Sequence, residues 1–153
     1  MKKFSLTVIT LVKNDEKNIE KTIKSIIFQK AIKFEYIIVD GGSNDNTLKI
    51  IKKYKSFIKR IISEKDVGIY DAMNKGIKKS NNDIIVFCNS GDFFYKNSLK
   101  NVIKIFNEKN VDFVFGTVRR NYTRTSIVKF GFDPKRIFYN FDFATAHSTG
   151  FFL

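Results

Sequence analysis

Short apolar runs alternate with amphipathic segments along most of the chain. Leu6 to Val12 is an apolar, β-branched run bounded by polar residues, and a similar run follows at Phe34 to Val39. Such runs are typical of strands that are buried on both faces of a sheet. Between them, isoleucines recur at helical spacing, at Ile19, Ile23, Ile26 and Ile27. The pattern therefore predicts a strand, a helix and a parallel strand joined by a right-handed crossover.

The same alternation continues beyond the second strand. Apolar residues at helical spacing predict helices over 48–54, 69–77 and 99–106, and apolar runs predict strands over 58–62, 84–88 and 111–118. Asn14 or Asp15 is predicted to cap the first helix, and Ser43 or Asn44 the second. From Asn121 onward the periodic signal weakens, which indicates an irregular or antiparallel region. Because strands and helices alternate, the sequence predicts an α/β layer fold.

Composition favours one packed unit in a reducing compartment. With 153 residues, of which 43% are hydrophobic, the chain can bury one core, and we expect a single domain over 1–153. Cys88 is the only cysteine and lies in an apolar run, so we expect a small buried hydrophobe. The apolar stretch from Phe4 ends at Lys13, and no apolar run reaches the ~18 residues of a membrane-spanning helix. We therefore expect a cytoplasmic protein.

The charge of the chain is strongly positive. Its formal net value is +13, which permits binding to phosphates, to an anionic membrane surface or to nucleic acid. Most of this charge is lysine spread over helical faces, where a solvated surface is the usual arrangement. No nucleic-acid recognition motif accompanies the charge, and the polar clusters are acidic. A basic nucleic-acid-binding domain therefore ranks last among the alternatives.

Three polar clusters stand directly after predicted strands. Asp40 follows the second strand, Asp66 the third, and Asn89 to Asp92 the fourth. In open α/β sheets ligands bind outside the carboxyl ends of the strands, so these clusters should gather at one edge. The glycines and serine over 41–43 allow close backbone approach and a helix N-terminus that attracts anions, although a plain turn has the same composition. Asp83 precedes its strand, so we expect it in a turn at the opposite edge.

These clusters resemble the nucleotide-sugar half of a family 2 glycosyltransferase of the GT-A type. The matching segments are Val39 to Thr47, Ser63 to Gly76 and Asn89 to Asp92, and the resemblance extends from near Ser5 to Leu153. It implies a Rossmann-like, mostly parallel sheet flanked by helices. It also implies inverting transfer of a sugar from a nucleotide donor, most simply UDP-linked, to a hydroxyl of a surface glycan. A glycan or lipid-linked glycan acceptor would bring the enzyme into peripheral contact with the inner face of the cytoplasmic membrane.

The resemblance further assigns residues to the donor, the metal and the acceptor. Asp40 would contact the nucleobase, and Asp66 and Lys75 would flank the nucleotide. The implied donor-binding residues are Thr10, Asn14, Asp40, Gly41, Ser43, Asp66, Gly68, Tyr70, Asp71, Asn74, Lys75, Asn89 and Ser90. Asp92 would hold Mn²⁺ or Mg²⁺, and His147 would lie on the acceptor side. Asp66 and Asp71 also suit a helix start, and a lone histidine is more often structural.

Two departures from the family pattern bear on activity. Many relatives carry Asp-x-Asp and a further Asp where this chain has Asn89 to Asp92, so Asp92 is the sole carboxylate expected at a weakened metal site. Relatives place the general base farther along, so we expect that base beyond Leu153 and interpret the chain as truncated. Neither Asp133 nor Asp142 matches it. An inactive fragment that binds nucleotide sugar is therefore the alternative to a transferase.

Overall fold

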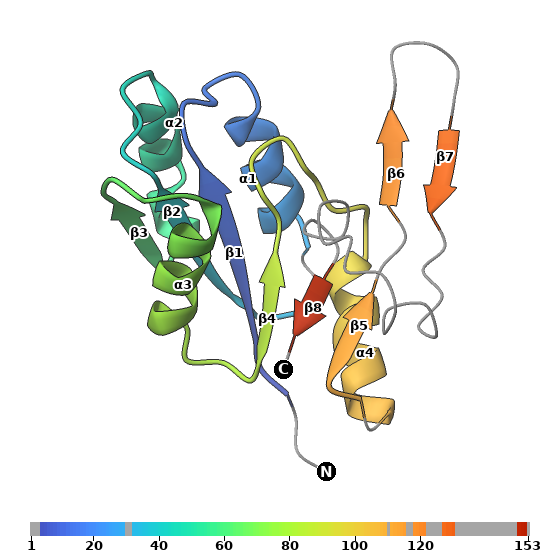
Figure 1. The fold of residues 1–153 in the computed structure, drawn as a ribbon. Coiled ribbons are helices and arrows are strands. Elements are labelled where there is room, and N and C mark those ends of the chain that lie inside the picture. The colour runs from blue at the N-terminus through green and yellow to red at the C-terminus, as the bar shows by residue number, and fades with distance from the viewer. Residues whose placement is uncertain are drawn as a thin grey trace.

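A sheet with helices on both faces organises the chain, which confirms the predicted α/β class (Figure 1). The computed structural model describes residues 4–29, 32–109, 111–115, 118–121, 127–130 and 150–152. Four parallel strands form one side of the sheet: β1 (Leu6–Val12), β2 (Glu35–Asp40), β3 (Arg60–Ser63) and β4 (Ile84–Phe87). Their order is β3-β2-β1-β4, so the strand order reverses between β1 and β4. All four carboxyl ends therefore lie at one edge of the sheet.

The remaining strands are short, and each of their described pairings is antiparallel. β8 (Gly150–Phe152) lies between β4 and β5 (Phe113–Phe115) and is antiparallel to both, while β6 (Val118–Asn121) and β7 (Ile127–Phe130) form a separate antiparallel pair. The antiparallel character expected after Asn121 is thus confirmed. The single strand predicted over 111–118 is wrong. That apolar segment supplies β5 and the start of β6, which pair with different partners.

Helices cover the two faces of the sheet unequally. One face of the sheet carries α1 (Ile19–Ile27), α2 (Thr47–Lys53), the short 3₁₀ helix η1 (Lys55–Phe57) and α4 (Ser98–Glu108). The other face carries α3 (Ile69–Lys79). Ile23 of α1 and Leu99 of α4 are wholly buried in the larger core cluster. Ala72 of α3 packs on Ile9 and the neighbouring sheet residues in the smaller one. Because β1 is central, all seven of its residues are buried, as its apolar run predicts.

The predicted helix caps are wrong by several residues. α1 begins only at Ile19, because the backbone oxygen of Asp15 accepts hydrogen bonds from the N–H groups of Asn18 and Ile19 and forms a turn first. α2 begins at Thr47 with Asn46 as its cap residue. The polar side chains ahead of both helices are engaged elsewhere, in contacts between the two loops. These loops lie at the carboxyl edge of the sheet, where the functional candidates gather.

Two smaller expectations are confirmed. Cys88 is wholly buried, and this burial raises the pKa of its thiol. Asp83 lies before β4, where its carboxylate accepts hydrogen bonds from the N–H and the hydroxyl of Ser5 at 3.0 and 2.8 Å. Within the described ranges, we find no helix with the length and apolar character needed to cross a membrane.

Candidate functional site

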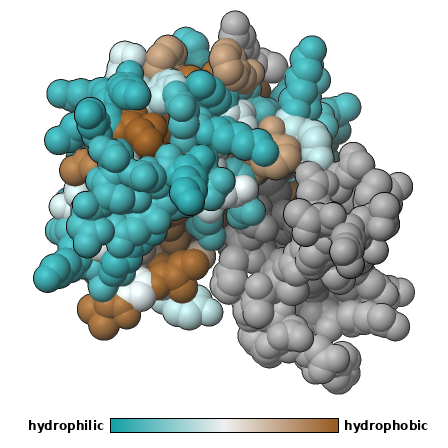
Figure 2. Space-filling view, turned by 90° about the horizontal axis from the view of Figure 1, so that it is seen from above, coloured by the Kyte–Doolittle hydropathy of each residue, from teal (hydrophilic) through white to brown (hydrophobic). Residues whose placement is uncertain are grey.

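A cleft of about 580 Å³ opens at the carboxyl edge of the parallel strands. It is lined by Leu11, Val12, Lys13, Asp66, Val67, Gly68, Ile69, Ala72 and Asn89. These residues come from the end of β1, from the loop and first turn of α3, and from the end of β4. The cleft therefore lies beside the point where strand order reverses, which is the usual ligand position in open α/β sheets. Figure 2 looks onto this edge and shows a largely hydrophilic surface with separate hydrophobic patches.

Asp66 is fixed in this cleft by a close approach to the β2–α2 loop. A Cβ added to Gly41 would lie 2.1 Å from Asp66 Oδ2, so the carboxylate occupies the space that only a glycine leaves open. Lys13 Nζ lies 3.8 Å from Asp66 Oδ1. The Asp66 side chain is 11% exposed and that of Lys13 is 53% exposed. A nearly buried anion and a largely solvated cation thus stand together in the cleft.

Asp40, in contrast, is wholly buried and is not among the residues that line the cleft. One carboxylate oxygen accepts the hydroxyl proton of Ser63 at 2.6 Å, and the other accepts that of Ser43, whose N–H also points at the group. Asp40 therefore ties the end of β2 to the end of β3 and to its own loop. Its predicted contact with a nucleobase stays a prediction.

The loops after β1 and β2 hold each other. The N–H of Asn14 donates to Ser43 Oγ at 2.8 Å, and Asn14 Oδ1 accepts from the N–H of Asn44 at 2.9 Å. The hydroxyl of Thr47 chiefly lowers the pKa of the Asp45 carboxyl, which also accepts from the N–H groups of Thr47 and Glu16. Asn14 and Ser43 thus lie at the predicted edge of the sheet, where their side chains hold the two loops together. Thr10 is buried in the sheet, where its hydroxyl bonds that of Tyr36 at 3.0 Å.

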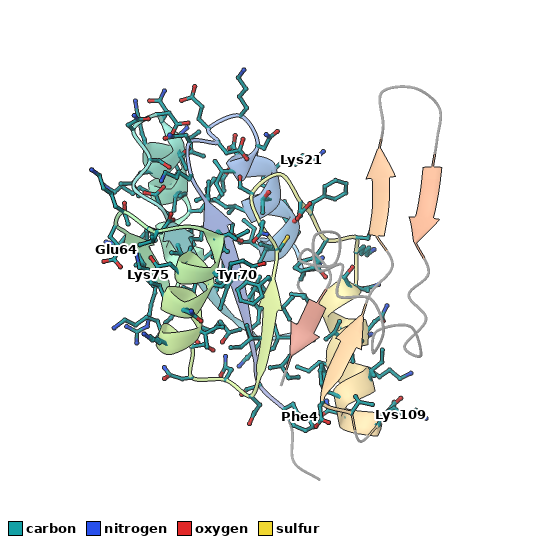
Figure 3. All side chains as sticks on the ribbon, in the orientation of Figure 1. Phe4, Lys21, Glu64, Tyr70, Lys75 and Lys109 are labelled. Carbon is teal, nitrogen blue, oxygen red and sulfur yellow. The ribbon has the colours of Figure 1, made fainter. Side chains whose placement is uncertain are left out.

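Lys75 closes the loop that precedes α3. Its ammonium group lies 3.0 Å from Asp71 Oδ2 and 3.2 Å from Glu64 Oε1, and it donates to the backbone oxygen of Lys65 at 2.8 Å. Asp71 also accepts from the N–H of Val67 at 3.1 Å. The hydrogen bond between the two side chains raises the pKa of Lys75 and lowers that of Asp71. Figure 3 shows Lys75 beside Glu64, so this residue, which the resemblance assigns to donor binding, holds the loop ahead of α3.

Other residues of the 66–76 motif divide between backbone and surface roles. Gly68 has φ +137°, a conformation that L side chains rarely adopt. Tyr70 is 62% exposed and Asn74 is exposed on α3. Gly76 is buried, and a Cβ there would lie 2.7 Å from Ile9 Cγ2. The last glycine of the motif therefore lets α3 pack against β1.

The loop after β4 is anchored by two residues that the motif alone does not identify. Thr22 of α1 accepts from the N–H of Gly91 at 3.1 Å and donates to the backbone oxygen of Asp92 at 2.8 Å. Asp15 Oδ2 accepts the hydroxyl proton of Ser90 at 2.6 Å. Asn89 Oδ1 is buried and has no hydrogen-bond partner in the described part of the chain.

The carboxyl edge presents few metal ligands. Among the described residues no group of three or more histidine, cysteine, aspartate or glutamate side chains is arranged to hold an ion. Asp92 is the only carboxylate of the 89–92 loop. Gly91, with φ +92°, contributes none. His147, the predicted acceptor-side residue, lies outside the described residues.

The chain is similar in sequence to two bacterial glycosyltransferases. It is 33% identical over 121 residues to the poly(ribitol-phosphate) β-N-acetylglucosaminyltransferase TarP of Staphylococcus aureus (strain N315), a match that covers 76% of this chain and 36% of TarP. It is 28% identical over 141 residues to the UDP-Glc:α-D-GlcNAc-diphosphoundecaprenol β-1,3-glucosyltransferase WfgD of Escherichia coli, covering 92% of this chain and 55% of WfgD. The chain thus spans only part of the length of these relatives.

Solved structures share the fold. S. aureus TarS 1–349 in complex with UDP-GlcNAc matches with a TM-score of 0.75 and 21% identity, over 97% of this chain and 45% of TarS 1–349. The mannosyltransferase PcManGT of Pyrobaculum calidifontis, in complex with GDP-Man and Mn²⁺, matches with a TM-score of 0.70 and 21% identity, over 78% of this chain and 36% of PcManGT. Both likenesses support the GT-A fold. The profile of glycosyl transferase family 2 matches residues 7–151, and the chain belongs to that family.

Proposed function

We propose that this chain binds a UDP-linked sugar in the cleft between β1, β4 and α3, and that the protein transfers the sugar to a hydroxyl of a surface glycan. The observation that most supports this proposal is the cleft itself, which lies where the strand order reverses in a family 2 chain. The UDP-GlcNAc complex of TarS and the polymer and lipid-linked acceptors named for TarP and WfgD support this choice. Transfer by the whole protein is part of the same proposal.

The chemistry we propose is an inverting displacement at the anomeric carbon of the donor. The acceptor oxygen attacks that carbon, the bond from the carbon to the diphosphate oxygen breaks, and a carboxylate takes the hydroxyl proton. The cleft residues serve the donor side of this reaction. Leu11, Val12 and Ala72 supply apolar walls, and the loop held by Lys75 forms one rim. The general base is not assigned to any described residue.

We propose that Asp92 holds a divalent cation together with the diphosphate of the donor. Its carboxylate is a hard oxygen ligand of the kind that Mn²⁺ and Mg²⁺ prefer. Since the described residues form no three-ligand cluster, the diphosphate would supply the other charged ligands. When bound, such a cation neutralises charge on the leaving diphosphate. The Mn²⁺ in the PcManGT complex supports this assignment.

We also propose peripheral contact with an anionic membrane surface. The segment 46–63 carries six lysine and arginine residues and no acidic residue, and the net charge of the chain is +13. Each basic residue near an anionic surface contributes attraction of about 1 kcal/mol, which salt screens over roughly 8 Å at physiological strength. Sedimentation with phosphatidylserine vesicles should therefore fall as salt rises. Sedimentation that ignores salt would rule out an electrostatic contact.

The decisive experiment combines donor binding with turnover. Calorimetry with UDP and with UDP-GlcNAc should show saturable binding, and a radiolabelled UDP-sugar should be turned over when a suitable acceptor is supplied to the whole protein. Binding without any turnover would favour the second candidate, a module that binds nucleotide sugar but does not transfer it. Asn89 and Gly91, which stand where many relatives have carboxylates, also favour this candidate. Absence of nucleotide binding would remove both candidates.

A further inference from the structure

Polar side chains occupy one face of α1 although this helix packs on the sheet. Thr22 is wholly buried, Ser25 is partly buried, and Gln29, just beyond the end of the helix, is 6% exposed. Their spacing along the chain places them on one side of the helix. A buried polar side chain costs free energy unless it forms hydrogen bonds, so this face requires partners. Each of the three side chains has a partner in the loop between β4 and α4.

The part of this loop that carries Asp92 is held at its backbone by Thr22. The Thr22 hydroxyl accepts from the N–H of Gly91 at 3.1 Å and donates to the backbone oxygen of Asp92 at 2.8 Å. The preceding helical residue adds a further contact, because the Lys21 ammonium group lies 4.5 Å from the centroid of the Phe93 ring (Figure 3). The loop is therefore fixed against α1 on both sides of the Asp92 side chain.

The same face of α1 holds the next two residues of the loop. Ser25 Oγ accepts from the N–H of Phe94 at 3.2 Å, and Gln29 Nε2 donates to the backbone oxygen of Tyr95 at 2.9 Å. The face is itself connected, since Gln29 Nε2 also donates to the backbone oxygen of Ser25 at 3.2 Å. Residues 91–95 belong to no strand or helix, so side chains of α1 supply contacts that a regular element would otherwise supply.

The hydroxyl at position 22 is not required for packing. Valine has the shape of threonine and would fill the same buried space without a polar atom. It would, however, remove the hydrogen bonds of Thr22 to the N–H of Gly91 and the backbone oxygen of Asp92. Gly91 has φ +92°, a conformation that favours glycine, so Thr22 bonds the loop at a sharp turn. The hydroxyl therefore serves the loop rather than the core.

We propose that Thr22, supported by Ser25 and Gln29, is a positioning residue that sets where the Asp92 carboxylate stands in the donor site. The inference rests on the proposed function, in which Asp92 holds a cation together with the diphosphate of the donor. Thr22 acts through the backbone of the loop, which its hydroxyl bonds as both donor and acceptor. Metal-assisted binding of the diphosphate thus depends on a helix that contributes no residue to the lining of the cleft.

The geometry of a metal site makes it sensitive to such support. Oxygen ligands hold Mn²⁺ or Mg²⁺ within about 0.2 Å of a fixed distance, so a small displacement of the loop weakens the bond from Asp92. Groups that orient a metal-binding side chain typically contribute about 10- to 100-fold to metal affinity. Thr22 bonds the backbone of Asp92 rather than its carboxylate, so we expect an effect below that range.

The test compares UDP binding by the full chain with and without Mn²⁺, measured by calorimetry. The ratio of the two affinities is the metal enhancement. Thr22→Val should lower this ratio by about threefold or more and leave the affinity without Mn²⁺ within about twofold of the wild-type value. Thr22→Ser, which keeps the hydroxyl, should retain most of the enhancement. A general loss of structure would lower both affinities together, so the ratio separates positioning from folding.

Thr7→Val is the matched control. Thr7 is also wholly buried, and its hydroxyl donates to Glu35 and accepts from the side chains of Ser80 and Asn82 at the amino ends of the parallel strands. Its loss should lower the unfolding free energy, as Thr22→Val does, but leave the metal enhancement unchanged. Urea unfolding measures the stability of both variants.

Ser25→Ala extends the test to the rest of the polar face. It removes the contact to the N–H of Phe94, which lies beyond Asp92 in the loop, so the metal enhancement should fall by less than in Thr22→Val. Circular dichroism checks that Thr22→Val is folded. If it is not, Ser25→Ala decides alone, and an unchanged enhancement in that variant overturns the inference.

The outcomes separate the two proposals. If the wild-type chain binds no UDP, the proposed function fails and the inference falls with it. If UDP binds but Mn²⁺ does not strengthen its binding, the metal assignment and the inference fail while donor binding stands. If Thr22→Val is folded and keeps the full enhancement, or if Thr7→Val loses it equally, the inference is overturned and the proposed function stands.

Discussion

The carboxylate of Asp66 fills the space over Gly41 into which a side chain at position 41 would project. A Cβ there would lie 2.1 Å from Asp66 Oδ2 and 2.9 Å from Asp66 Cγ. The obstacle is the far end of a side chain, so an added methyl group would displace Asp66 rather than the backbone. Gly41 also donates its N–H to the backbone oxygen of Val12 at 2.9 Å, which keeps the ends of β1 and β2 in register.

Gly41→Ala should therefore damage ligand binding more than stability. Asp66 would turn away and lose its position beside Lys13, so we expect UDP affinity to fall about tenfold. The unfolding free energy should fall by only about 1 kcal/mol, the low end of the range for overpacking. Calorimetry and urea unfolding measure the two quantities. Unchanged UDP affinity would show that the position of Asp66 does not matter for binding.

Gly76→Ala should show the opposite balance. The new methyl group would lie 2.7 Å from Ile9 Cγ2 and 3.4 Å from Val39 Cγ2, in the packed layer between α3 and the sheet. Overpacking of this kind costs about 1–3 kcal/mol, which exceeds the roughly 1 kcal/mol that alanine gains over glycine in a helix. Urea unfolding should show net destabilisation. Asn74→Ala, at an exposed position on the same helix, is the control and should be neutral or slightly stabilising.

The Asp71–Lys75 pair should give the loop before α3 a defined pH window. The pKa of Asp71 is lowered, chiefly by the hydrogen bond from Lys75, so its contribution is present above the ordinary aspartate pKa and is lost as pH falls through the lowered one. The pKa of Lys75 is raised, chiefly by Asp71, so its contribution is present below the ordinary lysine pKa and is lost as pH rises through the raised one. The loop should be most protected between these limits.

Lys75→Met tests this window directly. The pKa of Asp71, followed by carboxyl carbon NMR, should rise toward its ordinary value because the largest stabilising partner of the charged form is gone. Hydrogen exchange of the backbone over 64–68 should speed up at neutral pH. Lys79→Met, on an exposed lysine of the same helix, should change neither quantity. An Asp71 pKa that stays low in Lys75→Met would assign the shift to the N–H of Val67 instead.

The central sheet was predictable because its strands are apolar on both faces. β1 has the bounds that its run of β-branched residues predicts, β2 is shifted from prediction by one residue at both ends, and β4 is one residue shorter at its carboxyl end. The segment 111–118 was not predictable in the same way. An apolar run indicates burial but carries no information about pairing partners, and β5 pairs with β8 while β6 pairs with β7. Helix starts were missed because loop-to-loop contacts recruit the expected cap residues.

The site was predictable only to the level of the strand edge. Strand-end reasoning brings Asp66 and Asn89 to one cleft, as observed. It does not show that Asp40 is turned inward, that Lys75 is held by Glu64 and Asp71, or that Lys13 joins Asp66. Those facts depend on side-chain packing between segments far apart in sequence. For Gly41 and Gly76 the need for glycine comes from a neighbouring element rather than from the motif.

Asp40→Asn should reveal whether the buried carboxylate is structural. The variant keeps the shape of the side chain but weakens hydrogen bonds that Ser43 and Ser63 now donate to a charged group, which are worth about 1.5–3 kcal/mol each before exposure of Ser63 to solvent is considered. We expect a lower unfolding free energy with a smaller loss of UDP affinity than in Asp66→Asn. Urea unfolding measures the unfolding free energy, and calorimetry measures the UDP affinity. A larger loss of UDP affinity than in Asp66→Asn would instead support the predicted contact of Asp40 with the nucleobase.

Mn²⁺ should strengthen UDP binding, and Asp92 should carry that effect. Asp92 is the only carboxylate of the 89–92 loop, so Asp92→Ala should remove a metal enhancement that we expect to be about tenfold in the wild type. Binding that does not depend on Mn²⁺ should persist, because the substitution leaves the cleft residues Asp66 and Lys13 unchanged. Calorimetry with and without Mn²⁺ measures the metal enhancement and the metal-independent UDP affinity, and Asp112→Ala serves as the control. If Asp92→Ala keeps the full enhancement, the cation lies elsewhere. Asp15 would then be the next residue to substitute, because its carboxylate already contacts Ser90 of the same loop.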